Sequence, residues 1–206
     1  QYDALGNLAA TTHGAQTTNN LVDPTGLGNL VGQYASGGSQ IARYTYGLGL
    51  ASQVAGGNTN YYQFGTVGNT AALTNAAGTV LNSYSYLPFG GLLHSTGTAA
   101  NPFSFVGQFG VSADGNGLYD MRARSYDPEI GQFLSNDPMG LVAGDMNLRR
   151  YAANAPTVLV DPSGLEYAPG DVLTGSSVWN AMFAGDFGAA MAGVGLTLVR
   201  ATGTGV

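Results

Sequence analysis

The stretch from Gly117 to Leu165 reads GLYDMRARSYDPEIGQFLSNDPMGLVAGDMNLRRYAANAPTVLVDPSGL and is the most informative part of this chain of 206 residues. It ends two successive passages with nearly the same phrase, Asp137-Pro-Met-Gly-Leu141 and Asp161-Pro-Ser-Gly-Leu165. Each phrase predicts a tight turn, because proline fixes φ after an Asp that can accept hydrogen bonds from the turn backbone. The two carboxylates can be ordinary turn residues or a catalytic pair, and the phrases alone leave both interpretations open.

Six short motifs follow one another in this stretch, and their order identifies a family. The motifs are Tyr119-Asp-Met-Arg-Ala-Arg124, Tyr126-Asp-Pro-Glu-Ile-Gly131, Asp137-Pro-Met-Gly-Leu141, Leu148-Arg-Arg-Tyr151, Asn154-Ala-Pro156 and Asp161-Pro-Ser-Gly-Leu165. This series resembles the C-terminal core segment of RHS proteins, which are also called YD-repeat proteins. Weaker YD-like phrases, such as Tyr2-Asp-Ala-Leu-Gly-Asn-Leu8, extend the resemblance to the N-terminus.

The resemblance implies a β-sheet that spirals into a hollow shell around a C-terminal cargo, often a toxin. It also implies that the two-Asp segment is a self-cleaving aspartyl protease, with Asp137 and Asp161 as the catalytic pair and Leu165-Glu166 as the scissile bond. Arg149 and Arg150 are the candidates to support Asp137. In such a pair one carboxylate acts as general base on water while the other, protonated, assists the carbonyl. No metal or cofactor is needed.

A repeat of forty residues supports a β-sheet. Gly28-Asn29 recurs as Gly68-Asn69, Gly38 recurs as Gly78, and Tyr44-Thr-Tyr46 recurs as Tyr84-Ser-Tyr86. Residues 41–46 and 80–86 are expected to be strands bounded by glycine-rich turns, with their alternate tyrosines on one face. We favour cross-strand packing of these rings, and the alternative is a surface on which carbohydrate stacks.

The chain contains few charged residues, and its polar residues are mostly neutral. The chain has no Lys and no Cys, 33 Gly and only 9% charged residues. Strands without edge charges have little protection against edge-to-edge pairing, so the partners we expect are the remainder of a larger shell or other copies of the chain. The net charge of −6 and the dispersed arginines argue against nucleic acid as a partner.

Neither histidine suggests a metal site. His13 and His94 lack a second histidine or an acid at ligand spacing, so both are expected to be structural or exposed to solvent. The absence of Cys removes disulfide and thiolate chemistry. Serines are numerous, but no Gly-x-Ser-x-Gly motif is present.

Residues 166–206 form an apolar tail of different character. Between Val172 and Val199 the only charge is Asp186, and small residues recur four apart, which favours a helix that packs closely. The tail can pack against the sheet or a neighbouring copy, begin a membrane-active toxin, or anchor the chain in a membrane. The missing flanking Lys and aromatic residues favour packing.

We therefore expect a mainly β protein in which YD-repeat hairpins form a curved antiparallel sheet, with a short helical tail. The expected divisions are repeats at 1–113, the core segment at 114–165 and the tail at 166–206. The chain begins with Gln1 and not with Met, so we expect that it starts after processing or is a portion of a longer protein, and it holds too few repeats to close a shell alone.

Three functions remain open, all outside the cytoplasm, either secreted or at the cell surface. The first is a shell that cleaves itself after Leu165 and releases its tail. The second is a subunit of a filament or tube without catalytic activity. The third is an adhesive or carbohydrate-binding module.

Overall fold

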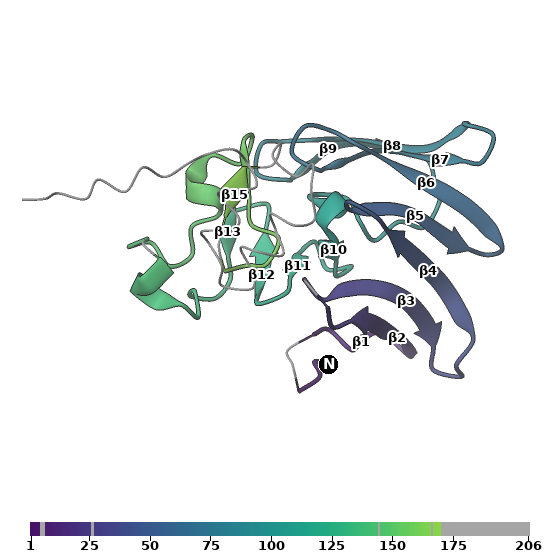
Figure 1. Cartoon of the computed structure of the whole chain (residues 1–206), viewed down its shortest axis with the longest axis horizontal. Helices are drawn as coiled ribbons and strands as arrows, with labels where there is room; N and C mark the ends of the chain where they lie inside the picture. Colours follow the sequence, from purple (N-terminus) through teal and green to yellow (C-terminus); the bar gives the residue numbers. More distant parts are fainter. Residues whose placement is uncertain (5–6, 26, 144, 166, 170–206) are drawn as a thin grey trace, which may run out of the picture.

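A computed structural model describes residues 1–4, 7–25, 27–143, 145–165 and 167–169. Most of the chain before residue 97 is one antiparallel sheet in which every strand pairs with its sequence neighbours. Its nine strands are β1 (Ala10–His13), β2 (Gln16–Asp23), β3 (Asn29–Ala35), β4 (Gln40–Tyr46), β5 (Leu50–Ala55), β6 (Asn58–Phe64), β7 (Thr70–Asn75), β8 (Val80–Tyr86) and β9 (Leu92–Thr96). Figure 1 shows that this sheet curves around the elements that follow it.

The second part is smaller and built from short elements. A 3-10 helix η1 (Gly107–Phe109) leads into a four-stranded antiparallel sheet of β10 (Ser112–Ala113), β11 (Tyr119–Met121), β12 (Arg124–Asp127) and β13 (Gln132–Phe133). Two more 3-10 helices, η2 (Gly140–Ala143) and η3 (Ala152–Asn154), precede a pair of strands, β14 (Leu159–Val160) and β15 (Ala168–Pro169). The mainly β prediction is confirmed, and the predicted helical tail lies outside the described residues.

The forty-residue repeat corresponds to repeated hairpins. The strands predicted at 41–46 and 80–86 are β4 and β8. Gly38 and Gly78, which precede them, have φ values of 83° and 80°, a region that glycine enters at little cost. The repeat therefore preserves the turns as well as the strands.

The inner face of the sheet is both aromatic and hydrogen-bonded. Tyr44 is 4% exposed, and its hydroxyl donates to Gln33 Oε1 at 2.7 Å. Tyr62 repeats the arrangement on β6, donating to Gln53 Oε1 at 2.7 Å. These rings pack in the interior, as the sequence favoured, so the buried Tyr44 offers no surface on which a sugar could stack.

The segment that follows β9 turns back and fills this inner face. Phe103 is fully buried, and its ring meets Tyr44 edge-on with centroids 4.8 Å apart. Buried side chains of the sheet hold the segment's backbone, since Thr70 Oγ1 donates to the Phe103 carbonyl at 2.7 Å and Gln53 Nε2 donates to the Ala100 carbonyl at 2.8 Å. The returning chain thus covers the inner face of the sheet and accepts hydrogen bonds from its buried polar side chains.

A second aromatic core lies under the small sheet. Phe105, Tyr126, Phe133 and Tyr151 are each at most 1% exposed, and the rings of Tyr126 and Tyr151 have centroids 4.4 Å apart. Because side chains alternate along a strand, Arg124 shares the inward face of β12 with Tyr126. A charge thus points into this core, and it needs partners there.

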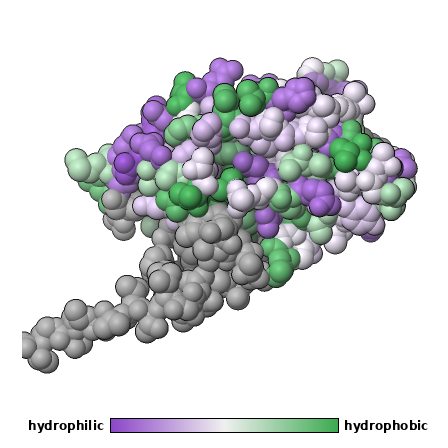
Figure 2. All heavy atoms as spheres, turned by 90° about the horizontal axis from the view of Figure 1, so that it is seen from above, coloured by the Kyte–Doolittle hydropathy of each residue, from purple (hydrophilic) through white to green (hydrophobic). Residues whose placement is uncertain are grey.

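The surface is largely neutral. Figure 2 shows one face on which much of the area is pale, with hydrophilic and hydrophobic residues interspersed. The edge strand β9 is exposed along its whole length, including Leu92 at 53% and Leu93 at 65%. Within the described ranges, no helix is long and apolar enough to cross a bilayer.

Candidate site of paired aspartates

The two Asp-Pro phrases form the turns that the sequence predicts. Asp137 Oδ1 accepts the Met139 amide at 2.8 Å, and the Gly140 amide donates to the Asp137 carbonyl at 3.0 Å. In the second turn, Asp161 Oδ1 accepts from Ser163 Oγ at 3.0 Å and from the Leu165 amide at 3.2 Å. Each turn uses one carboxylate oxygen locally and leaves the other available for a different partner.

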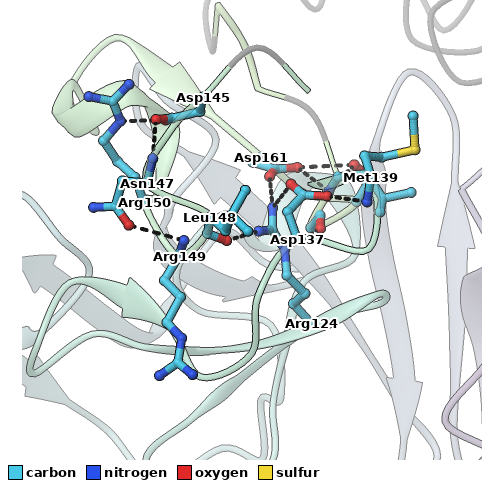
Figure 3. Close-up of polar contacts among 12 residues, drawn as sticks. Arg124, Asp137, Met139, Asp145, Asn147, Leu148, Arg149, Arg150 and Asp161 are labelled. Carbon is cyan, nitrogen blue, oxygen red and sulfur yellow. Dashed lines mark hydrogen bonds and ion pairs between the residues drawn. The ribbon is translucent and has the colours of Figure 1, made fainter. Parts of the chain in front are cut away.

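The second oxygens of both carboxylates meet on one cation. Arg124 Nη2 lies 3.0 Å from Asp137 Oδ2 and 3.2 Å from Asp161 Oδ2. Figure 3 shows the two aspartates side by side, with the guanidinium of Arg124 pointing at both. The side chains of all three residues are at most 8% exposed. A shared guanidinium allows two buried carboxylates to lie close together without unscreened repulsion.

Arg124 is itself fixed by further contacts. Its Nη1 donates to the Leu148 carbonyl at 3.1 Å, and its Nε donates to the Gly164 carbonyl. Its guanidinium carbon lies 3.7 Å from the centroid of the Phe133 ring, which is a cation–π contact. Burial lowers the pKa of Arg124, and the charges of Asp161 and Asp137 oppose that shift. An arginine remains charged under these conditions.

Leu165 is part of the same site. It lines a pocket of about 30 Å³ together with Arg124, Asp137 and Asp161, and that volume is sufficient for a water molecule. Because the Leu165 amide donates to Asp161, the residue before the expected scissile bond is tied to one of the two acids. Glu166, on the other side of that bond, lies outside the described residues.

The arginines expected to support Asp137 have other contacts. Arg149 Nε donates to Asn136 Oδ1 at 2.9 Å, and Arg150 Nε lies 2.5 Å from Asp145 Oδ2. In Figure 3 the Arg149 side chain points away from the two aspartates, and the pair of Arg150 with Asp145 lies to one side of them. The residue that sequence reasoning missed is Arg124, and its place two residues before Tyr126 on a core strand was the available signal.

The other acids among the described residues do not share this arrangement. Asp23 and Asp127 also precede proline, and each accepts the amide two residues ahead, at 2.9 Å and 2.8 Å. The local turn is therefore common to Asp-Pro phrases, while the contact with Arg124 distinguishes Asp137 and Asp161. His13 contacts the Asp114 carbonyl and His94 is exposed on β9. Among the described residues, no cluster of three His, Cys, Asp or Glu could hold a metal ion.

The fold recurs in known toxin complexes. The chain superposes on the crystal structure of TcdB2-TccC3-TEV with a TM-score of 0.59, at 19% identity over 80% of this chain. A Tc holotoxin pore of Photorhabdus luminescens gives a TM-score of 0.61 over 81% of the chain. Each superposition covers 9% of the larger chain. At these identities the likeness establishes a shared mainly β fold.

In sequence, the chain is similar to several bacterial toxin proteins. It is 32% identical over 139 residues to the toxin subunit YenC1 of Yersinia entomophaga and 47% identical over 66 residues to the toxin protein Tse5 of Pseudomonas aeruginosa. These matches cover 66% and 32% of this chain. The chain spans 14% of YenC1 and 5% of Tse5, a small part of either relative. No protein-family model matches the chain.

Proposed function

We propose that this chain is the closing part of an RHS-type shell that acts outside the cytoplasm and cleaves itself after Leu165. The observation that carries the proposal is the convergence of Asp137 and Asp161 on Arg124 Nη2, beside Leu165 and a pocket of water size. The small fraction of each toxin relative that the chain spans is consistent with a segment of a larger encapsulating protein. Residues 1–113 then provide shell wall, 114–165 the cleavage centre and 166–206 the released segment.

The proposed reaction is hydrolysis by a carboxylate pair. A water molecule attacks the carbonyl carbon of Leu165 while one carboxylate of the pair takes its proton. The pair then returns a proton to the leaving nitrogen, the bond between residues 165 and 166 breaks, and a new carboxylate and a new amine form. Arg124 orients both acids throughout, and its N–H groups balance the negative charge that develops near them. The two acids act as one unit, so the proton is assigned to the pair.

Conservative variants test the assignment. Asp137→Asn and Asp161→Asn each keep the oxygen that serves the turn and remove one member of the pair, so either change should abolish cleavage. Asp127→Asn is the matched control, because Asp127 has the same proline and the same local hydrogen bond. Cleavage is scored by denaturing electrophoresis over a range of protein concentrations, and an intramolecular reaction has a rate independent of concentration. Cleavage that persists in either pair variant would refute the assignment.

A second candidate function is a noncatalytic subunit of a self-assembling filament or tube. The observation that favours it is the fully exposed edge strand β9, which carries Leu92 and Leu93 and contains no Asp, Glu, Lys or Arg. Such an edge can pair with another strand. Light scattering on the purified chain decides this, because a salt-insensitive monomer excludes the assembly and concentration-dependent growth in mass supports it.

A further inference from the structure

Arg122 joins parts of the molecule that are far apart in sequence. It lies at the turn between β11 and β12, and its guanidinium donates to four oxygens. Nη2 donates to the Phe109 carbonyl at 2.7 Å and to Asn29 Oδ1 at 3.1 Å, Nη1 donates to the Pro162 carbonyl at 2.5 Å, and Nε donates to the Leu27 carbonyl. All four acceptors are neutral, and three are backbone carbonyls. One side chain thus connects the β2–β3 hairpin, η1 and the turn that holds Asp161.

The surrounding backbone is shaped for this guanidinium. Arg122 has φ of 59°, a region in which a residue other than glycine is strained. Gly110 has φ of 76°, and a Cβ at that position would lie 2.9 Å from Arg122 Nη2 and 2.9 Å from Asn29 Oδ1. Position 122 is therefore an arginine although its backbone conformation suits glycine. Position 110 is a glycine, and any side chain there would occupy the space of the Arg122 guanidinium.

The Asp161 turn packs against the turn between β11 and β12, which contains Arg122. The Ala123 amide donates to the Ser163 carbonyl at 3.1 Å, and Arg122 holds the carbonyl of Pro162. Gly164 packs so closely that a Cβ there would lie 2.5 Å from the Met121 carbonyl oxygen. These contacts fix the backbone on both sides of Pro162, and with it the direction in which Asp161 faces Arg124.

From this geometry we infer that Arg122 is a positioning residue that makes the Asp137–Asp161 pair depend on docking of the β2–β3 hairpin. The guanidinium reaches the Pro162 carbonyl in its present place while Leu27 and Asn29 of the β2–β3 hairpin hold it from the other side. Cleavage then follows completion of the fold, so the chain is not cut before its sheet is in place. This inference rests on the proposed self-cleavage. Arg124 contacts both reacting carboxylates, whereas Arg122 acts through the backbone of the Asp161 turn.

Three variants of the full chain separate this role from a merely structural one. Arg122→Gly removes the guanidinium and relieves the strained φ, Arg122→Lys retains the charge but loses the planar fork, and Asn29→Ala removes one acceptor on the sheet. Arg43→Gln is the control, since Arg43 is an exposed arginine of β4. For each chain, circular dichroism checks the fold and mass spectrometry follows the first-order appearance of the fragment that ends at Leu165.

The expected result is slower cleavage in a folded chain. A displaced carboxylate costs a large factor in rate, so Arg122→Gly and Arg122→Lys should slow cleavage by roughly 10- to 100-fold, and Asn29→Ala by a smaller factor. Arg43→Gln should cleave at the unmodified rate. If Arg122→Gly does not fold, Asn29→Ala carries the test, because it removes a single neutral partner at the far end of the connection. Unmodified rates in the folded Arg122 variants, or in Asn29→Ala where only that variant folds, overturn the inference.

Hydrogen exchange supplies a second measurement that does not require cleavage. The amides of Ala123 and Gly164 donate to the Ser163 and Asp161 carbonyls, so both should be protected in the unmodified chain and in Asp137→Asn. They should lose protection in Arg122→Gly and keep it in Arg43→Gln. If the unmodified chain is never cut, the proposed function fails, and this exchange measurement alone decides the positioning role. Unchanged protection in Arg122→Gly contradicts that role.

Discussion

Replacing Arg124 should show how far the stability of the fold depends on pairing this arginine with the two buried acids. We consider Arg124→Met, which keeps an unbranched stem and removes the charge and all N–H donors. The comparison uses two backgrounds that both lack an intact acid pair, Asp137→Asn and the double variant Asp137→Asn/Asp161→Asn. Under the proposed mechanism neither is cleaved, so the same covalent chain is compared throughout.

The magnitude follows from burial. In the Asp137→Asn background, Arg124→Met leaves the Asp161 carboxylate, whose side chain is 4% exposed, without its cation. Removing one partner of a buried pair costs about 3 to 5 kcal/mol of unfolding free energy. In the double background no carboxylate remains at either position, and Arg124 is then a buried charge without a counter-charge. Relief of that unpaired charge partly offsets the loss of two hydrogen bonds to carbonyls and of the contact with Phe133, so the net cost is about 1 to 2 kcal/mol.

Urea unfolding followed by far-ultraviolet circular dichroism measures both costs. The difference between the backgrounds should be about 2 kcal/mol or more, because residues in direct contact do not behave additively. Arg150→Met is the control, since its partner Asp145 is partly exposed and such a pair contributes less than about 1 kcal/mol. Equal costs of Arg124→Met in the two backgrounds would refute the view that this arginine compensates the buried acids.

Three further predictions concern other parts of the molecule. Burial raises the pKa of Asp120 to about 6 from 3.8, so its protonated form stabilises the fold at low pH and that contribution is lost as the pH rises through 6. The free energy of unfolding of Asp120→Asn, measured relative to that of the unmodified chain, should therefore be roughly 1 to 3 kcal/mol higher at pH 7 than at pH 4. Urea unfolding at the two pH values measures this, and the same relative stability at both would contradict it. Gly164→Ala should cost roughly 2 kcal/mol or more and stop cleavage, because φ is +67° and the added Cβ meets the Met121 carbonyl; an unaltered melting temperature would argue against it. Leu93→Lys should lower the apparent mass measured by light scattering if β9 mediates association, and an unchanged mass would contradict that role of β9.

Much of the large sheet could be predicted from local patterns. The glycine and tyrosine spacing located β4 and β8 because turn conformations and side-chain alternation depend on neighbouring residues. The passage of residues 98–105 along the inner face could not be predicted in this way. It depends on contacts such as Thr70 with Phe103, which join residues distant in sequence.

The candidate site likewise has one part that local sequence predicts and one part that depends on contacts distant in sequence. The turns at Asp137 and Asp161 are local and follow from their phrases. The cation that joins them comes from β12, and only tertiary packing brings Arg124 to both. Arg149 and Arg150 were chosen because they lie near Asp137 in sequence, but the backbone between them directs their side chains to Asn136 and Asp145. An arginine that alternates with tyrosine on a core strand was a better indicator of the residue that binds the two acids than closeness to Asp137 in sequence.

We propose that the acids joined by Arg124 cut the chain after Leu165. The most direct test is the intact mass of the freshly purified chain under denaturing conditions, measured beside Asp137→Asn. We expect two species from the unmodified chain, one ending at Leu165 and one beginning at Glu166, and a single full-length species from the variant. A single full-length mass from both would contradict it, and the paired Asp-Pro phrases would then be structural turns.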